Sequence, residues 1–214
     1  MRTIRVTGKG QIRVHPDMTR VRITLEGTYK DYAKTLKHCS RETEELRALL
    51  VPFGFEGSDL KTLHFDVDTK YERYDENNIW KQRFVGYKYS HVMKVEFESD
   101  NDRLGKILYA LGNSTLNPEF SISYTVKDPE AAKNELLGDA VRDAVAKAGV
   151  LADAAGLSLG DIQAVDYSWS EIDFEVHPMG RPQTTLAEEN CIDLNIEPDD
   201  IELQDTVTVV WEIA

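Results

Sequence analysis

The sequence contains very little cysteine and no long apolar run, and both absences restrict what the protein is. Cys39 and Cys191 are the two cysteines among 214 residues, and they form no Cys-x-x-Cys pattern. Neither a disulfide framework nor a thiolate metal site is therefore indicated. No segment approaches the roughly 20 apolar residues of a membrane-spanning helix, and the first residues show no apolar core of a signal peptide. We therefore expect a cytoplasmic protein without membrane insertion.

Basic side chains are also scarce. The 25 Lys and Arg residues stand against 38 Asp and Glu residues, which gives a formal net charge of -13. A field of this sign repels phosphate backbones, so we expect no nucleic-acid partner. With 41% hydrophobic and 29% charged residues, the composition of this acidic protein is typical of a globular chain of one or two domains.

Apolar side chains recur with the period of a strand in some segments of the chain and with the period of a helix in others. Residues 3–14 and 21–25 alternate apolar and polar side chains, which predicts strands with one face on a core. Leu36, Cys39, Thr43, Leu46 and Leu50 then step by three and four, which predicts a helix that carries Cys39 as a core thiol. Residues 120–126 alternate again.

The second half of the chain predicts one long helix and three closing strands. Asp128-Pro129 is a typical helix start, and Gly156 is a typical end. The predicted inner face of this helix consists of Leu137, Val141, Ala144, Ala148, Leu151 and Ala155. Strands are predicted at residues 162–174, 191–196 and 206–213. Because strands and helices alternate irregularly, the pattern favours an α+β fold with largely antiparallel sheets packed against long helices.

A projecting hairpin is predicted around the turn-forming residues Asp75 to Asn78. Aromatic side chains flank this turn on both sides: Tyr71, Tyr74, Trp80, Phe84 and Tyr87. Aromatic rings on a projecting element are typical of a protein interface. The alternative is that these rings cover the sheet of their own chain, and the sequence favours neither interpretation. Under the interface hypothesis, replacing Trp80 and Tyr74 with Ala shifts the assembly toward smaller species.

The best ligand-like spacing is that of His64, Asp66 and Asp68, which project from one face of a predicted strand. They are the candidates for a metal site, and the alternative is a solvated strand face. We predict no catalytic residue and no cofactor. The chain has no Gly-x-Ser-x-Gly elbow, and Gly8-x-Gly10 lacks the third glycine of a dinucleotide fingerprint, so we interpret it as a strand bend or bulge.

Several stretches resemble the SIMPL-domain family, a family of unknown function. They are the opening Ile4 to Gly10 (IRVTGKG) with Pro16-Asp17, the segment 54–62 (GFEGSDLKT), Gly86-Tyr87, and the Ala-rich helix from Asp139 to Gly160. The resemblance implies two α/β subdomains, one of them plait-like (ferredoxin-like). It also implies relatives that form ring-shaped or channel-like oligomers, that include periplasmic and outer-membrane antigens, or that are linked to oxidative stress or to a signalling kinase.

Together these observations predict a domain division and a function. We expect one subdomain from residues 1–80 plus 160–214, and a second, plait-like subdomain from residues 81–159 with the long Ala-rich helix. The expected function is that of a non-enzymatic homo-oligomer or protein-binding module whose partner is unknown. The alternative is a metal-dependent protein or enzyme centred on His64, Asp66 and Asp68.

Overall fold

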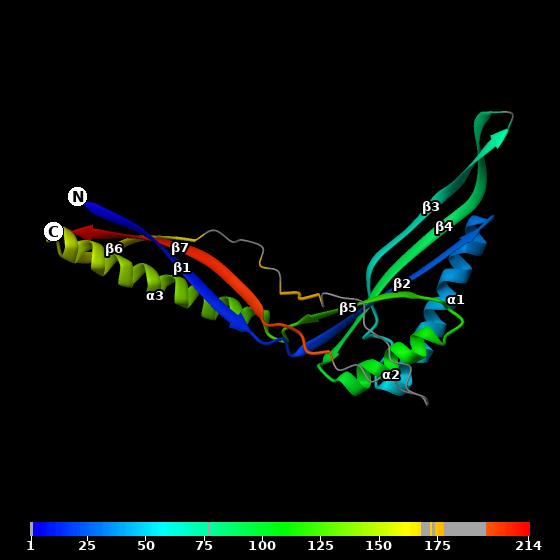
Figure 1. Cartoon of the computed structure of the whole chain (residues 1–214), viewed down its shortest axis with the longest axis horizontal. Coiled ribbons are helices and arrows are strands. Elements are labelled where there is room, and N and C mark those ends of the chain that lie inside the picture. The colour runs from blue at the N-terminus through cyan, green and yellow to red at the C-terminus, as the bar shows by residue number, and fades with distance from the viewer. Residues whose placement is uncertain (1, 77, 168–171, 173, 178–195) are drawn as a thin grey trace. The chain divides into compact units, whose positions relative to one another are not determined.

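The computed structural model describes residues 2–76, 78–167, 172, 174–177 and 196–214. Figure 1 shows its elements, which confirm the predicted α+β class with antiparallel sheets. In chain order they are β1 (Thr3–Val14), β2 (Met18–Tyr29), α1 (Tyr32–Leu50), the 3-10 helix η1 (Val51–Phe53), β3 (Lys61–Glu76), β4 (Ile79–Glu98), α2 (Asn101–Gly112), β5 (Glu119–Thr125), α3 (Pro129–Ala155), β6 (Leu159–Asp166) and β7 (Ile201–Ile213).

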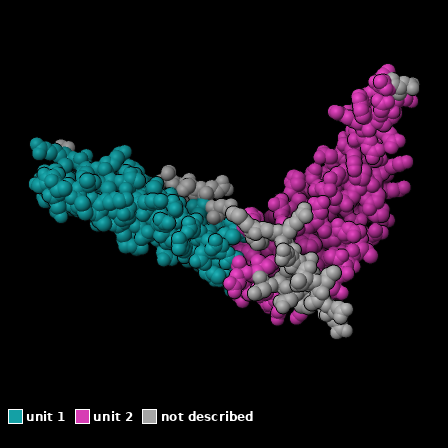
Figure 2. Space-filling view, in the orientation of Figure 1, with its two compact units in different colours: residues 1–17, 125–176, 198–214 teal, residues 18–124, 177–197 magenta. Residues whose placement is uncertain are grey.

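The chain divides into two compact units, coloured separately in Figure 2. Unit 1 consists of residues 1–17, 125–176 and 198–214, and unit 2 consists of residues 18–124 and 177–197. The predicted division placed its boundaries between residues 80 and 81 and between residues 159 and 160, and the observed units have neither boundary. The reason is that β3 and β4 form one hairpin, which holds both sides of residue 80 in one unit, whereas α3 packs on β1 and β7.

Unit 2 is a plait. Its elements follow the order β2-α1-β3-β4-α2-β5, and its four strands lie in the order β3-β4-β2-β5, which is the ferredoxin-like arrangement. The expected plait is therefore present, although it begins at β2 and excludes α3. Strands β2 and β4 pair antiparallel from Met18↔Glu98 to Tyr29↔Tyr87 without a register shift.

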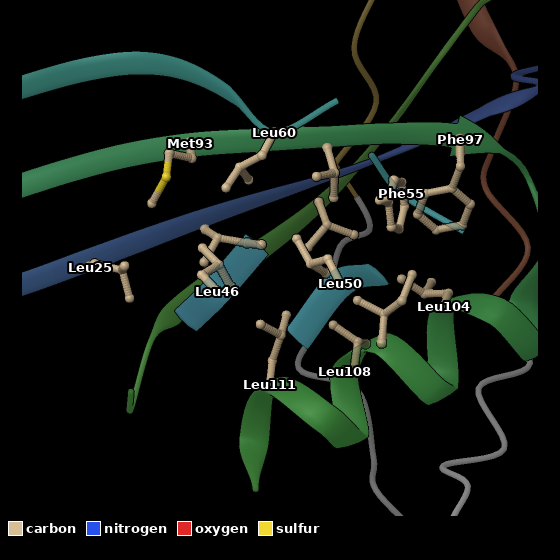
Figure 3. Close-up of a cluster of buried hydrophobic side chains, with 14 of the residues drawn as sticks. Leu25, Leu46, Leu50, Phe55, Leu60, Met93, Phe97, Leu104, Leu108 and Leu111 are labelled. Atoms are coloured by element: carbon tan, nitrogen blue, oxygen red, sulfur yellow. The ribbon is translucent and has the colours of Figure 1, made fainter. Parts of the chain in front are cut away.

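The core of unit 2 lies between this sheet and the helices α1 and α2. Figure 3 shows Leu46 and Leu50 of α1 converging with Leu104, Leu108 and Leu111 of α2 beneath the sheet residues Leu25, Met93 and Phe97. Arg103 of α2 closes one end of this core: its guanidinium lies 4.5 Å from the ring centre of Phe55 and 4.8 Å from that of Phe97. The leucine side chains of the two helices thus pack against the inward-facing side chains of the strands, and together they form the core between the two layers.

Aspartate begins each α-helix that the structure describes. The side chains of Asp31, Asp100 and Asp128 accept hydrogen bonds from the backbone N–H three residues on, which satisfies one free donor of each first turn. The predicted start of the long helix at Asp128-Pro129 is confirmed, as is its end at Gly156, where φ is 68°. A helix ends in this way at a residue that readily adopts the left-handed conformation, most often glycine.

In unit 1, the sheet β1-β7-β6 packs against α3. The pairing of β1 with β7 runs from Thr3↔Glu212 to Val14↔Ile201 without a shift, so Gly8-x-Gly10 does not form the predicted bulge. Both glycines instead allow the helix to approach the strand closely. A Cβ atom on Gly8 would lie 2.8 Å from Cβ of Ala144, and one on Gly10 would lie 2.9 Å from the backbone N of Ala140.

This close approach also corrects part of the predicted inner face of α3. The buried side chains of the helix are Ala132, Leu136, Ala140, Ala144, Ala148 and Ala152. Ala144 and Ala148 are confirmed, whereas the predicted Leu137, Val141 and Leu151 each lie one position away from a buried residue. Leu151, which the prediction placed inside, is 50% exposed. The prediction followed the largest apolar residues, whereas a helix pressed against a glycine-containing strand must turn its smallest residues inward.

The predicted closing strands are partly correct. Strand β6 occupies 159–166 rather than 162–174, and β7 extends the predicted strand 206–213 back to Ile201. The predicted strand 191–196 lies outside the described residues except for Ile196. Within the described part of the chain, no helix has the length and apolar character that a membrane crossing requires.

Candidate functional site

The part of β3 and β4 beyond the end of β2 forms a two-stranded ribbon, which we call the distal hairpin (residues 71–86). Strand β2 ends its pairing at Tyr29↔Tyr87, and beyond that point β3 and β4 continue to pair with each other, from Tyr71↔Phe84 to Glu76↔Ile79. Gly86 marks the boundary, since a Cβ atom there would lie 2.8 Å from the carbonyl carbon of Tyr29. The ribbon projects past α1 and β2 in Figure 1, as predicted from the sequence.

One face of the distal hairpin carries a ladder of aromatic rings. The centroids of Tyr71 and Phe84 lie 5.7 Å apart, those of Phe84 and Tyr87 lie 5.3 Å apart, and Tyr87 contacts Tyr32 of α1 at 5.4 Å. Trp80 pairs with Asp75, and alternation along β3 places it on the same face as Tyr71. The exposed fractions are 56% for Tyr71, 46% for Phe84 and 72% for Trp80. We call Tyr71, Trp80 and Phe84 the aromatic face.

Tyr74 lies on the opposite face of the ribbon, so the five predicted interface residues do not form a single patch. Its cross-strand partner is Lys81, and the guanidinium of Arg83 lies 6.0 Å from its ring centre. Arg83 also pairs with Glu72 at 3.0 Å. This face therefore combines Tyr74 with charged side chains. On the aromatic face the rings of Tyr71 and Phe84 contact each other, and alternation places Arg73 and Asp75 on that face as well.

The distal hairpin differs in charge from the rest of the chain. Its basic residues are Arg73, Lys81 and Arg83, and its acidic residues are Glu72, Asp75 and Glu76, so these charges cancel within a protein of net charge -13. Two of the opposite charges, those of Lys81 and Glu76, pair across the turn. The ribbon itself therefore adds no net charge to the repulsion between two such molecules.

The candidate metal ligands lie on the open face of the plait. His64 Nε2 lies 3.4 Å from Asp66 Oδ1; the side chain of His64 is exposed, and that of Asp66 is partly buried. Asp68 follows on the same face, where it pairs with Lys88 of β4. Among the described residues, no three His, Cys, Asp or Glu side chains converge as a metal site requires. The arrangement is that of a solvated strand face.

A buried polar cluster around His91 was not predicted from the sequence. His91 Nδ1 lies 3.1 Å from Thr43 Oγ1 and 3.8 Å from Cys39 Sγ, and its Nε2 lies 2.9 Å from Thr62 Oγ1. The Thr43 hydroxyl donates its hydrogen to the Cys39 carbonyl at 2.8 Å, so it accepts from Nδ1–H. Both nitrogens of the imidazole are hydrogen-bonded, and in the neutral ring Nε2 accepts from the Thr62 hydroxyl.

Burial governs the ionisation of this cluster. Burial, with a smaller contribution from the Arg47 guanidinium, lowers the pKa of His91. Burial also raises the pKa of the Cys39 thiol, which confirms Cys39 as an enclosed core residue. A protonated thiol is a weak nucleophile, and the neutral imidazole beside it does not stabilise the reactive thiolate. The signal that indicates the cluster is the position of His91 among the inward residues Tyr89 and Met93 of β4.

A second polar contact anchors the base of the distal hairpin to α1. Glu42 of α1 accepts hydrogen bonds from the hydroxyls of Tyr89 and Tyr29, the latter at 3.3 Å. Burial and the Glu42 carboxylate raise the pKa of Tyr89 and of Tyr29. The ring of Tyr29 stacks on His38 at 4.1 Å. These contacts join β2, β4 and α1 at the point where β2 ends.

Comparison with known families matches residues 4–211 to the model described as SIMPL, protein of unknown function (DUF541). The chain belongs to the SIMPL family. Its relatives include the 26 kDa periplasmic immunogenic protein of Brucella abortus, which is 28% identical over 98% of this chain and 84% of that protein. The uncharacterized protein YggE of Edwardsiella ictaluri is 22% identical over 97% of this chain and 85% of that protein.

The names of the SIMPL relatives contradict the predicted cytoplasmic location. The Brucella abortus and Brucella melitensis proteins are named periplasmic. The prediction relied partly on scarce cysteine, but a thiol as enclosed as Cys39 is protected from oxidation in any compartment. Low cysteine content therefore does not separate a cytoplasmic SIMPL protein from an exported one.

Proposed function

We propose that the chain is a non-enzymatic assembly protein that associates with further copies of itself through the aromatic face of the distal hairpin. The observation that carries this proposal is the exposure of Tyr71, Trp80 and Phe84 on a ribbon that extends past the end of β2. The polar atoms of the His91 cluster are already hydrogen-bonded to one another, which favours a binding role over a catalytic one.

The low stability expected of an isolated two-stranded ribbon supports the proposal that a partner covers it. A two-stranded hairpin is marginally stable in water unless another layer covers it. A buried aromatic side chain contributes about 150–250 Å² of contact area, and each 100 Å² removed from water contributes about 2.5 kcal/mol. Covering the three half-exposed rings therefore offsets a substantial part of the association cost of about 4–15 kcal/mol.

The charges on the ribbon support a second copy as the occupant. Two molecules of net charge -13 repel each other over most of their surfaces. Within the distal hairpin, Arg73, Lys81 and Arg83 balance Glu72, Asp75 and Glu76. Two such ribbons meet without net repulsion, and each supplies both signs for cross-chain ion pairs.

Face-specific variants test this proposal by sedimentation velocity at micromolar concentration. Tyr71→Ser with Trp80→Ser removes two rings from the aromatic face, and we expect it to shift the chain to smaller species. The matched control, Tyr74→Ser with Ile79→Ser, removes two apolar side chains from the opposite face and should leave the assembly intact. Equal effects of the two variants, or no effect of the first, would contradict the proposal.

We also propose that the protein acts in the periplasm, as the names of its Brucella relatives indicate for those proteins. Osmotic-shock fractionation of the native host should release the protein with periplasmic markers. Recovery with the cytoplasmic fraction would remove this part of the proposal and would leave the hairpin interface unaffected.

A further inference from the structure

Strand β1 is an edge strand of the unit 1 sheet, and its free side is occupied by side chains of α3. The sheet order is β1-β7-β6, so β1 has a strand neighbour on one side. On the other side, the backbone N–H of Lys9 donates to Asp143 Oδ2 at 2.6 Å, and that of Gln11 donates to Asp139 Oδ2 at 3.0 Å. Both N–H groups would otherwise be available to another strand.

The spacing of these contacts follows from the geometry of the two elements. Lys9 and Gln11 are two positions apart on an extended strand, a rise of about 6.8 Å. Asp139 and Asp143 are four positions apart on a helix, a rise of about 6.0 Å. One helical turn therefore matches two strand residues, so each carboxylate reaches one free donor.

Close packing holds the carboxylates at this edge. Gly8 and Gly10 alternate with Lys9 and Gln11 and let α3 approach the face of β1. The carboxylates then reach past the face to the free edge. Lys147 Nζ contacts Asp143 Oδ2 at 2.7 Å, and Arg142 Nη2 lies 3.6 Å from Asp139 Oδ1. Hydrogen bonds from Lys147 and from the Lys9 backbone lower the pKa of Asp143.

We propose that Asp139 and Asp143 form an edge lock, which prevents β1 from pairing with β1 of a second copy of this chain. An exposed sheet edge is a template for strand addition, and proteins protect such edges with charge or by covering them. The edge lock covers the edge, because each carboxylate accepts the hydrogen bond of one free N–H of β1. It is independent of the distal hairpin, which lies in the other unit.

Hydrogen exchange measured amide by amide tests the lock directly. In Asp143→Ala, the Lys9 amide should exchange about tenfold faster or more while Gln11 is unchanged, and Asp139→Ala should show the reverse. Alanine favours the helix, so folding should be preserved. The control Glu135→Ala with Asp153→Ala removes the same charge from exposed positions of α3 and should leave both amides as in the wild type. Unchanged exchange in the single variants would overturn the lock.

Association is measured with the double variant Asp139→Ala with Asp143→Ala in the Tyr71→Ser, Trp80→Ser background, so that contacts through the hairpin do not contribute. Sedimentation velocity should show larger species that increase with concentration, whereas the Glu135, Asp153 control in the same background should not. Faster exchange without larger species would show that the carboxylates do not prevent strand addition, and would also overturn the proposal.

Discussion

Adding one methyl group to Gly8 or to Gly149 should change the stability of unit 1 in opposite directions. Gly8→Ala places a Cβ atom 2.8 Å from Cβ of Ala144, and closer still to the carbonyl oxygen of Ala140. Ordinary contacts of a Cβ atom begin at 3.4 Å, so β1 and α3 must separate by at least the difference, 0.6 Å. Overpacking of this kind costs about 1–3 kcal/mol.

Gly149→Ala is the matched control. Gly149 lies within α3, and a Cβ atom there meets nothing within 4 Å. Replacing glycine with alanine inside a helix stabilises it by about 0.5–1 kcal/mol, so this variant should be more stable than the wild type.

Hydrogen exchange of the β7 amides reports the opening of unit 1 specifically, since β7 is the central strand of its sheet. Because each 1.4 kcal/mol is a factor of ten, Gly8→Ala should accelerate this exchange by about tenfold, and Gly149→Ala should slow it by a few-fold. Exchange in Gly8→Ala at or below the wild-type rate would refute the reasoning, because it would mean that strand and helix do not require glycine at their contact.

Two further predictions concern the His91 cluster. Because the pKa of His91 is lowered in the folded chain, the unfolded chain binds more protons, and stability should fall as the pH drops below about 6.5, by at most about 1.4 kcal/mol per pH unit for one proton. Urea denaturation should show this fall, and His91→Gln should flatten it; an equal slope in the variant would exclude His91 as the cause. Cys39 should react with iodoacetamide only after unfolding, because its thiol is buried and its pKa is raised; peptide mapping of the native protein that found Cys39 labelled would contradict its burial.

The sequence predicts the elements of this fold better than their partners. Alternation, leucine spacing and the caps at Asp128 and Gly156 are local signals, and each is present in the structure. The domain division depends on contacts between distant segments, such as that of β1 with α3, which no local pattern records. The face of α3 was misjudged for the same reason: which alanines turn inward depends on Gly8 and Gly10, more than 100 residues away.

The candidate site shows the same limit. The turn residues and aromatic side chains predict the projecting hairpin, but the face on which each ring lies depends on the cross-strand register, which separates Tyr74 from Tyr71. The His91 cluster joins residues of α1, β3 and β4, so each member alone is a single polar residue in an otherwise ordinary pattern. His64 and Asp66 do lie side by side as the strand period predicts, whereas a metal site needs a third convergent ligand that periodicity does not supply.

Self-association of the unmodified chain is tested most directly by its mass in solution. Light scattering coupled to size-exclusion chromatography, at micromolar concentration, should give a multiple of the 24.3 kDa chain mass. A mass of 24.3 kDa that persists as the concentration rises would contradict an assembly built on the distal hairpin.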